Sequence, residues 1–311
     1  MAEGKKYLYG PVTSRRLGLS LGVDIVPFKV CTLDCVYCQL GRTTQKTTER
    51  AEYVSPEAIL AELKERLSRG LQADFITIGG SGEPTLNSQL GELIDGIKKI
   101  TDIPVAVLTN GTLLCRQDVR ADCAKADVVL PSLDAGDKRT FEDINRPHED
   151  IVIENLVSGL CDFRKEFAGQ IWLEVFFIEG INTDASQIAK IKDAIEKIRP
   201  DKIQLNTAVR PTAETGIKRL NPEKLQAIDK QLGQKCEVVA DFSPGRGSEH
   251  IESKAEDVLS MLKRRPCSLN DICSGLGIHS NEALKYVNHF QQQGVVNSSE
   301  RDGIVFFKAL S

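Results

Sequence analysis

Residues 29–41 read KVCTLDCVYCQLG and bring three cysteines, Cys31, Cys35 and Cys38, close together in the chain. With the spacing Cys-x3-Cys-x2-Cys, three thiolates from one short loop can bind an iron-sulfur cubane and supply no fourth ligand. A zinc site uses four ligands, usually as two Cys-x2-Cys pairs or with histidines, and neither is nearby. Three buried cysteines without a metal are the other alternative. The spacing favours a 4Fe-4S cluster with one iron left open.

An open iron can chelate the amino and carboxylate groups of S-adenosylmethionine (SAM). An electron passed into the sulfonium then breaks a carbon-sulfur bond and gives a 5'-deoxyadenosyl radical, so the cofactors carry the chemistry and the protein positions them. We therefore expect two cofactors, a 4Fe-4S cluster and SAM. We also expect a reducing electron donor such as a flavodoxin or a ferredoxin as a partner.

The rest of the chain alternates apolar, β-branched runs with segments of helical periodicity. This order predicts parallel strands joined by right-handed crossovers. About six such units, with polar and Gly-rich sequence just after the strands, favour a partial TIM-like (β/α)6 barrel with its site at the carboxyl ends of the strands. An open doubly wound sheet is the alternative. The expected strands are 19–26, 74–78, 104–108, 126–130, 171–178, 202–206 and a short 237–240, and the helices 55–67, 88–100, 116–124, 137–144, 150–167, 184–198 and 222–232.

The cysteine motif resembles the signature of the radical SAM superfamily. This resemblance implies that Tyr37, just before the third cysteine, packs near the adenine of SAM; ordinary core packing is the alternative. The segment GGSGEPTL at 79–86 follows the second strand and resembles the family's Gly-Gly-Glu segment. The resemblance implies that Gly82, Glu83 and Pro84 hold the amino group of SAM.

Two further loops fall where this family contacts the ribose and the methionine part of SAM. LTNGTLL at 108–114 ends the third strand and PSLDAGD at 131–137 ends the fourth, which makes Thr109, Asn110, Ser132 and Asp134 candidates. Turn formation explains the same residues equally well. Polar residues also stand in or just beyond the later apolar strands, and on a barrel they can point into the cavity or outward; they are Glu174, Gln204, Asn206 and Arg210. Arg146 can bind a carboxylate or phosphate, or be a solvated loop residue.

The opening stretch 9–44 and GEPTL together resemble a subfamily of iron-sulfur oxidoreductases that is grouped with wyosine-type tRNA synthases. The resemblance covers about residues 7–250. The wyosine synthase proper is expected to bind a second cluster through upstream cysteines, but no cysteine precedes Cys31 in this chain. The six other cysteines are scattered without Cys-x2-Cys spacing, and buried small hydrophobes are their simplest interpretation.

The final part of the chain has a different organisation. A Ser-, Pro- and Gly-rich stretch at 243–253 is typical of a linker between a domain at 1–242 and a small domain at 254–311. Helices are expected at 254–263, 268–274 and 280–292, and strands at 295–297 and 304–308 flank the turn signal Asp302-Gly303. Three helices and a hairpin describe a winged helix. This part carries seven basic against six acidic residues, which is weak for a nucleic-acid binder.

Composition narrows the function classes. The chain has 311 residues, 41% of them hydrophobic, with 40 Lys plus Arg against 44 Asp plus Glu. This balance gives no global basic field for nucleic acid or membranes, and the start lacks a signal-peptide pattern. We expect a cytoplasmic enzyme without a membrane partner that modifies an unidentified substrate, a tRNA base or a small molecule. The alternative is a redox- or SAM-responsive regulator that binds nucleic acid through its winged helix. The sequence does not indicate an oligomeric state.

Overall fold

The computed structural model describes residues 7–209, 212–233, 235–240, 255–259, 261–262, 266–276, 278–301 and 304–310. The chain divides into two compact units, Pro11–Asp241 and a smaller one that combines Met1–Gly10 with Phe242–Ser311. Arg210, the expected linker at 243–253 and the Asp302-Gly303 turn lie outside the described residues. None of the described helices combines the length and apolar character needed to cross a membrane.

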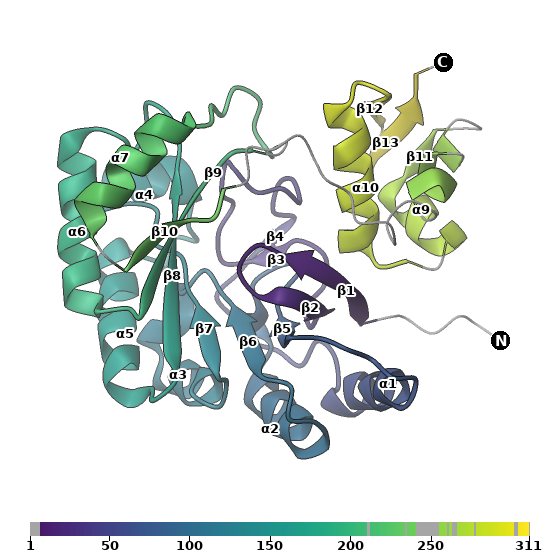
Figure 1. The fold of residues 1–311 in the computed structure, drawn as a ribbon, viewed down its shortest axis with the longest axis horizontal. Coiled ribbons are helices and arrows are strands. Elements are labelled where there is room, and N and C mark those ends of the chain that lie inside the picture. The colour runs from purple at the N-terminus through teal and green to yellow at the C-terminus, as the bar shows by residue number, and fades with distance from the viewer. Residues whose placement is uncertain are drawn as a thin grey trace. The chain divides into compact units, whose positions relative to one another are not determined.

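An eight-stranded sheet forms the centre of the fold, in the order β1-β2-β5-β6-β7-β8-β9-β10 (Figure 1). All neighbouring pairs from β2 to β10 are parallel. The order follows the chain from one edge to the other, as expected for a partial TIM-like barrel that is not closed. The strands are β1 (Leu8–Ser14), β2 (Gly18–Val23), β5 (Phe75–Ile78), β6 (Val105–Leu108), β7 (Val128–Leu130), β8 (Gln170–Phe177), β9 (Lys202–Thr207) and β10 (Cys236–Val238).

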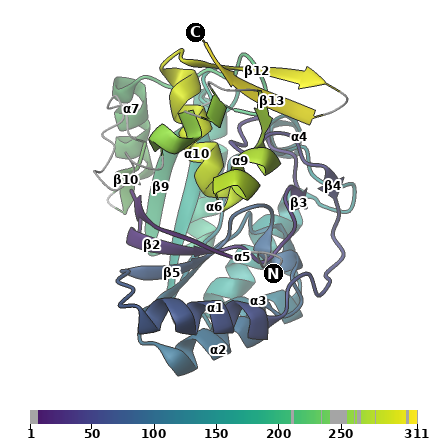
Figure 2. The ribbon, with the colours of Figure 1, turned by 90° about the vertical axis from the view of Figure 1, so that its right-hand side faces the viewer.

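Helices surround this sheet, and Figures 1 and 2 both show α1 and α2 side by side outside the strands. Local signals explain where they begin: the hydroxyl of Ser55 accepts from the backbone N–H of Ala58, and Pro56 occupies the first turn of α1. The α/β class and the alternation of strands and helices from β2 onward are confirmed, whereas the edge strand β1, which precedes the first expected strand, was not predicted. The helices are α1 (Pro56–Ser68), α2 (Leu90–Ile100), α3 (Gln117–Cys123), α4 (Lys138–Asn145), α5 (Ile153–Glu166), α6 (Ala185–Ile198) and α7 (Pro222–Leu232).

Two very short strands, β3 (Val30–Cys31) and β4 (Gln45–Lys46), were not predicted by the sequence pattern. They pair in parallel, with Cys31 opposite Lys46. Two residues carry no periodicity from which a strand can be recognised. The pair closes the loop that leaves β2 and so fixes the first cysteine.

The smaller unit contains a three-stranded antiparallel sheet in the order β11-β13-β12. Its elements are β11 (Cys267–Ser268), α9 (Leu269–Leu276), α10 (Ser280–Gln292), β12 (Val296–Arg301) and β13 (Ile304–Ala309), with further helical residues at 255–259 and 261–262. Val258, Ile272, Val287 and Phe290 belong to its buried core. Cys267 is buried in this core and lies in β11, directly before α9, which spans Leu269–Leu276 where a helix was expected at 268–274. The winged-helix assignment stays a prediction.

Candidate functional site

The three cysteines lie in the loop after β2, and this loop is fixed to the end of α4. The backbone N–H groups of Asp34 and Val36 donate to the carbonyls of Asn145 and Ile144, at 3.0 and 2.9 Å. The Cys38 N–H donates to the Cys35 carbonyl at 3.1 Å. The loop backbone is therefore held by hydrogen bonds from within and from α4, which orients the sulfurs without a bound group.

Each cysteine sulfur has a side-chain N–H donor. The Asn110 amide nitrogen lies 3.6 Å from Cys31 Sγ, the Asn145 amide nitrogen lies 3.4 Å from Cys35 Sγ, and the Lys29 ammonium lies 3.1 Å from Cys38 Sγ. The Leu33 backbone N–H adds a second contact to Cys31 Sγ at 3.5 Å. Donors of this kind suit anionic sulfur, and they are among the groups that tune iron-sulfur clusters.

The residues fit a cluster better than a single ion. Within the described ranges, no three Cys, His, Asp or Glu side chains gather closely enough to hold one metal ion. In a cubane each cysteine binds a different iron, so its ligands stand farther apart than the ligands of one zinc ion. Burial first, and then the charge of Glu83, raise the pKa of the Cys31 thiol to about 12. Without a metal the thiol form of Cys31 is therefore favoured, and binding of a metal would stabilise its thiolate.

Gly82 lets the Gly-rich loop after β5 approach the cysteine loop. A Cβ at this position would lie 1.9 Å from the Val30 carbonyl oxygen, which leaves no space for a side chain. The next backbone N–H, that of Glu83, donates to the same carbonyl at 3.0 Å. Pro84 then begins a short 3-10 helix, Pro84–Leu86. The close approach explains the glycine physically and joins the two predicted cofactor loops.

The Glu83 carboxylate is buried and joins three loops. Its Oε1 accepts from the Thr85 backbone N–H at 3.1 Å and from the hydroxyls of Thr85 and Thr109 at 2.5 and 2.6 Å. Its Oε2 accepts from the Asn110 backbone N–H at 2.8 Å. Burial raises the pKa of Glu83, while these hydrogen bonds oppose the rise. Oε2 keeps capacity for one more donor, which suits the expected ammonium of SAM.

Tyr37 is anchored at both its ring and its hydroxyl. The ring stacks on Phe176 of β8 with centroids 3.9 Å apart, and the hydroxyl donates to Asp134 Oδ2 at 2.5 Å. Asp134 also accepts from the Asn145 amide at 2.8 Å and from the Phe176 backbone N–H at 2.9 Å. Burial raises the pKa of Asp134 to about 6. One face of the Tyr37 ring is thus covered by the protein, so only the other face can meet an adenine.

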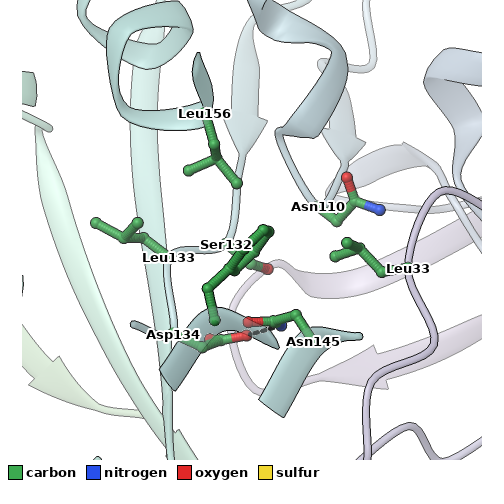
Figure 3. A pocket seen from close by; sticks show the side chains of 8 residues that line it. Leu33, Asn110, Ser132, Leu133, Asp134, Asn145 and Leu156 are labelled. Atoms are coloured by element: carbon green, nitrogen blue, oxygen red, sulfur yellow. Dashed lines mark hydrogen bonds between the residues drawn. The ribbon is translucent and has the colours of Figure 1, made fainter. Parts of the chain in front are cut away.

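Figure 3 shows Asp134 and Asn145 facing each other at a small cavity that Ser132 and Asn110 also line. Its volume is about 10 Å³, room for about one water molecule and far too little for SAM. The buried Asn145 Oδ1 has no hydrogen-bond partner among the described residues. A larger cavity of about 190 Å³ lies elsewhere, and its lining includes none of the predicted cofactor residues.

Asn206 belongs to a different group of polar side chains. Its amide donates to Glu174 Oε1 at 2.9 Å, and the other oxygen of Glu174 pairs with Arg16. Within the described part of the chain, no hydrogen bond joins this group to the cysteine loop, so a role for Asn206 in SAM binding stays a prediction. The Arg146 guanidinium pairs with Glu214 through Nη1 at 2.7 Å.

Hydrogen bonds bring Glu83, Thr109, Asn110 and Cys31 together, whereas Lys29 and Asn145 were not among the residues expected at the site. Lys29 stands in the run VPFKVC, where a single charge in apolar sequence beside a cysteine motif was the available signal. Asn145 lies 110 positions after Cys35 in the chain. No local pattern connects the two residues.

The chain is similar to known protein families and to several curated proteins. Residues 25–160 match the family model described as the radical SAM superfamily. The chain is 35% identical to the UPF0026 protein MJ1312 of Methanocaldococcus jannaschii over 308 residues, covering 96% of this chain and 94% of that protein. It is 38% identical to a protein named GTPase Obg from Brachyspira hyodysenteriae, covering 97% of this chain but only 45% of that protein.

Solved structures with the same fold include TYW1 with a lysine-pyruvate adduct bound, with a TM-score of 0.55 and 20% identity over 68% of this chain and 72% of that one. A radical SAM methyltransferase from Sphaerobacter thermophilus gives a TM-score of 0.53 and 15% identity over 72% and 67% of the two chains. At sequence identities of 15–20%, these comparisons show a similar fold and nothing further about this chain. This similarity agrees with a curved, mostly parallel sheet.

Proposed function

Because the chain belongs to the UPF0026 protein family and carries a radical SAM domain over residues 25–160, we propose that it cleaves SAM reductively at a cluster held by Cys31, Cys35 and Cys38. A 4Fe-4S cluster and SAM are the cofactors of this superfamily, and the chain is a radical SAM enzyme. The single observation that carries the assignment of the site is the set of N–H donors on all three sulfurs.

A cluster held by Cys31, Cys35 and Cys38 would supply the one electron needed for the reductive cleavage of SAM to methionine and a 5'-deoxyadenosyl radical. The protein's contribution is positional. Glu83 ties the loops after β5 and β6 together and offers Oε2 to the SAM ammonium. Gly82 and Pro84 shape that loop, and Thr109 and Asn110 connect it to Cys31. Ser132, Asp134 and Asn206 are the proposed contacts to the remainder of SAM, with Tyr37 beside its adenine.

We further propose that the substrate is a tRNA base. Support comes from the resemblance of the opening segment to the subfamily grouped with wyosine-type tRNA synthases, and from the smaller unit. In that unit α9, α10 and an antiparallel sheet match elements expected of a winged helix, a module that could recruit RNA even though its basic and acidic residues nearly balance. A low-potential donor of the flavodoxin or ferredoxin class would supply the electron.

Two measurements test these assignments. Anaerobically reconstituted protein should contain four irons and four sulfides per chain, which follows from one 4Fe-4S cluster. Comparative mass spectrometry of tRNA nucleosides from cells with and without the protein should reveal one missing modified nucleoside. An unchanged nucleoside profile, together with a changed profile of small metabolites, would refute tRNA as the substrate while leaving the SAM chemistry intact.

A further inference from the structure

Lys29 is a buried cation directed at a proposed cluster ligand. Only 3% of its surface is exposed, and its ammonium lies 3.1 Å from Cys38 Sγ. Among the described residues, no carboxylate oxygen lies within 4.0 Å of this ammonium, since no ion pair of Lys29 is found there. A buried charge without an opposite charge is unfavourable. The cysteine sulfur is therefore the group that its position serves.

The backbone around Lys29 holds the side chain in place. Its N–H donates to the Ser81 carbonyl at 2.7 Å, and its own carbonyl accepts from the N–H groups of Thr44 and Gln45 at 3.1 and 3.2 Å. Its φ of 60° lies in the left-handed region, which is uncommon for a residue other than glycine, asparagine or aspartate. These contacts fix Lys29 between the Gly-rich loop and β4, so the side chain leaves the backbone at a defined point beside the cysteines.

Lys29 also differs in charge from the other side chains that donate to the sulfurs. Asn110 and Asn145 present neutral amides to Cys31 and Cys35, whereas Lys29 presents a full positive charge to Cys38. A cubane with three thiolate ligands carries a net negative charge, and accepting one electron makes that charge more negative. A cation in a low-dielectric position therefore stabilises the reduced form more than the oxidised form.

We propose that Lys29 raises the reduction potential of the cluster and thereby sets how readily a one-electron donor can reduce it. Lys29 would act on the cluster through its positive charge, without contacting the substrate. This inference rests on the proposed cluster site. It adds an electrostatic role for a residue outside the Cys-x3-Cys-x2-Cys motif.

The test is an EPR-monitored redox titration of the reconstituted full chain. In Lys29→Met and Lys29→Gln the equilibrium constant for reduction should fall at least about tenfold, which is a 59 mV lower potential for a one-electron couple. Lys29→Arg should keep most of the wild-type potential. Lys46→Met is the matched control, because Lys46 lies in the same loop region but is exposed and, among the described residues, donates to the backbone carbonyls of Arg146 and Pro147 rather than to a cysteine sulfur.

The outcomes separate the claims. A wild-type potential in Lys29→Met would overturn the role of Lys29, and a wild-type potential in Lys29→Gln would overturn the role of its charge. Loss of the cluster in all three Lys29 variants would also contradict the inference, because Lys29 would then serve assembly. If the wild-type chain bound no 4Fe-4S cluster, both the proposed function and this inference would fail. If the wild-type chain bound the cluster and cleaved SAM, the proposed function would stand, and the potentials of the Lys29 variants would test the inference alone.

Discussion

Replacing Glu83 by glutamine should destabilise the iron-free protein measurably, although only one atom of the side chain changes. The carboxylate accepts from two backbone N–H groups on opposite oxygens, Thr85 at 3.1 Å and Asn110 at 2.8 Å. A glutamine has one oxygen and one NH2 group, so in either orientation its NH2 faces one of these N–H donors. One buried backbone donor must then lose its partner.

A buried donor without a partner costs about 1–3 kcal/mol. The larger unit has the size at which 1 kcal/mol lowers Tm by about 2–4 °C, so a loss of about 2 kcal/mol corresponds to about 4–8 °C. Glu83→Ala should cost more, because it leaves all the donors to the carboxylate without their acceptor. Thermal denaturation followed by circular dichroism at pH 7, with iron chelated, measures both.

Glu196→Gln is the matched control, since Glu196 is exposed on α6 and surface changes of this kind stay within about 0.5 kcal/mol. If Glu83→Gln unfolded at the wild-type temperature, the four hydrogen bonds would not hold the loops together and our account of this segment would be wrong.

Three more outcomes follow from the same geometry. In the reconstituted enzyme, Glu83→Gln should weaken SAM binding about ten- to hundredfold by equilibrium dialysis, since a charged hydrogen bond contributes about 1.5–3 kcal/mol; an unchanged Kd would limit the carboxylate to shaping the loop. Gly82→Ala should displace the Gly-rich loop from Val30, because a Cβ would lie 1.9 Å from its carbonyl oxygen, and the iron bound per chain should drop; full loading would show that the close approach is dispensable. In iron-free protein, Asp134 has a pKa of about 6, raised by burial. The folded state therefore keeps a proton that the unfolded chain releases near pH 4, and stability should fall by about 3 kcal/mol as pH rises from about 4 to 6. Asp134→Asn should flatten this fall in urea titrations, and an equally steep fall in the variant would assign it to other groups.

Much of the fold follows from local sequence. The strand-helix order and the start of α1 at Ser55 and Pro56 depend on periodicity and capping, which act over a few residues. The cysteine loop was likewise evident, because its ligands are close together in the chain. These features need no knowledge of long-range contacts.

What the sequence did not predict depends on contacts between distant segments. Asn145 meets Cys35 only because α4 packs against the cysteine loop, and Lys29 faces Cys38 because of an uncommon backbone conformation. The first ten residues group with the C-terminal unit, where the ring of Tyr9 stacks on His279 with centroids 4.8 Å apart. A division of the chain by composition could not reveal this contact. Loop registers of this kind become visible only in three dimensions.

The central claim is that this chain cleaves SAM at the cluster held by Cys31, Cys35 and Cys38. The most direct test incubates the anaerobically reconstituted protein with SAM and dithionite and measures 5'-deoxyadenosine by liquid chromatography and mass spectrometry. We predict that wild type and Cys115→Ala, whose exposed cysteine lies outside the motif, form 5'-deoxyadenosine, and that Cys35→Ala forms none. Equal formation in Cys35→Ala, or none in a wild-type protein loaded with its cluster, would contradict the account.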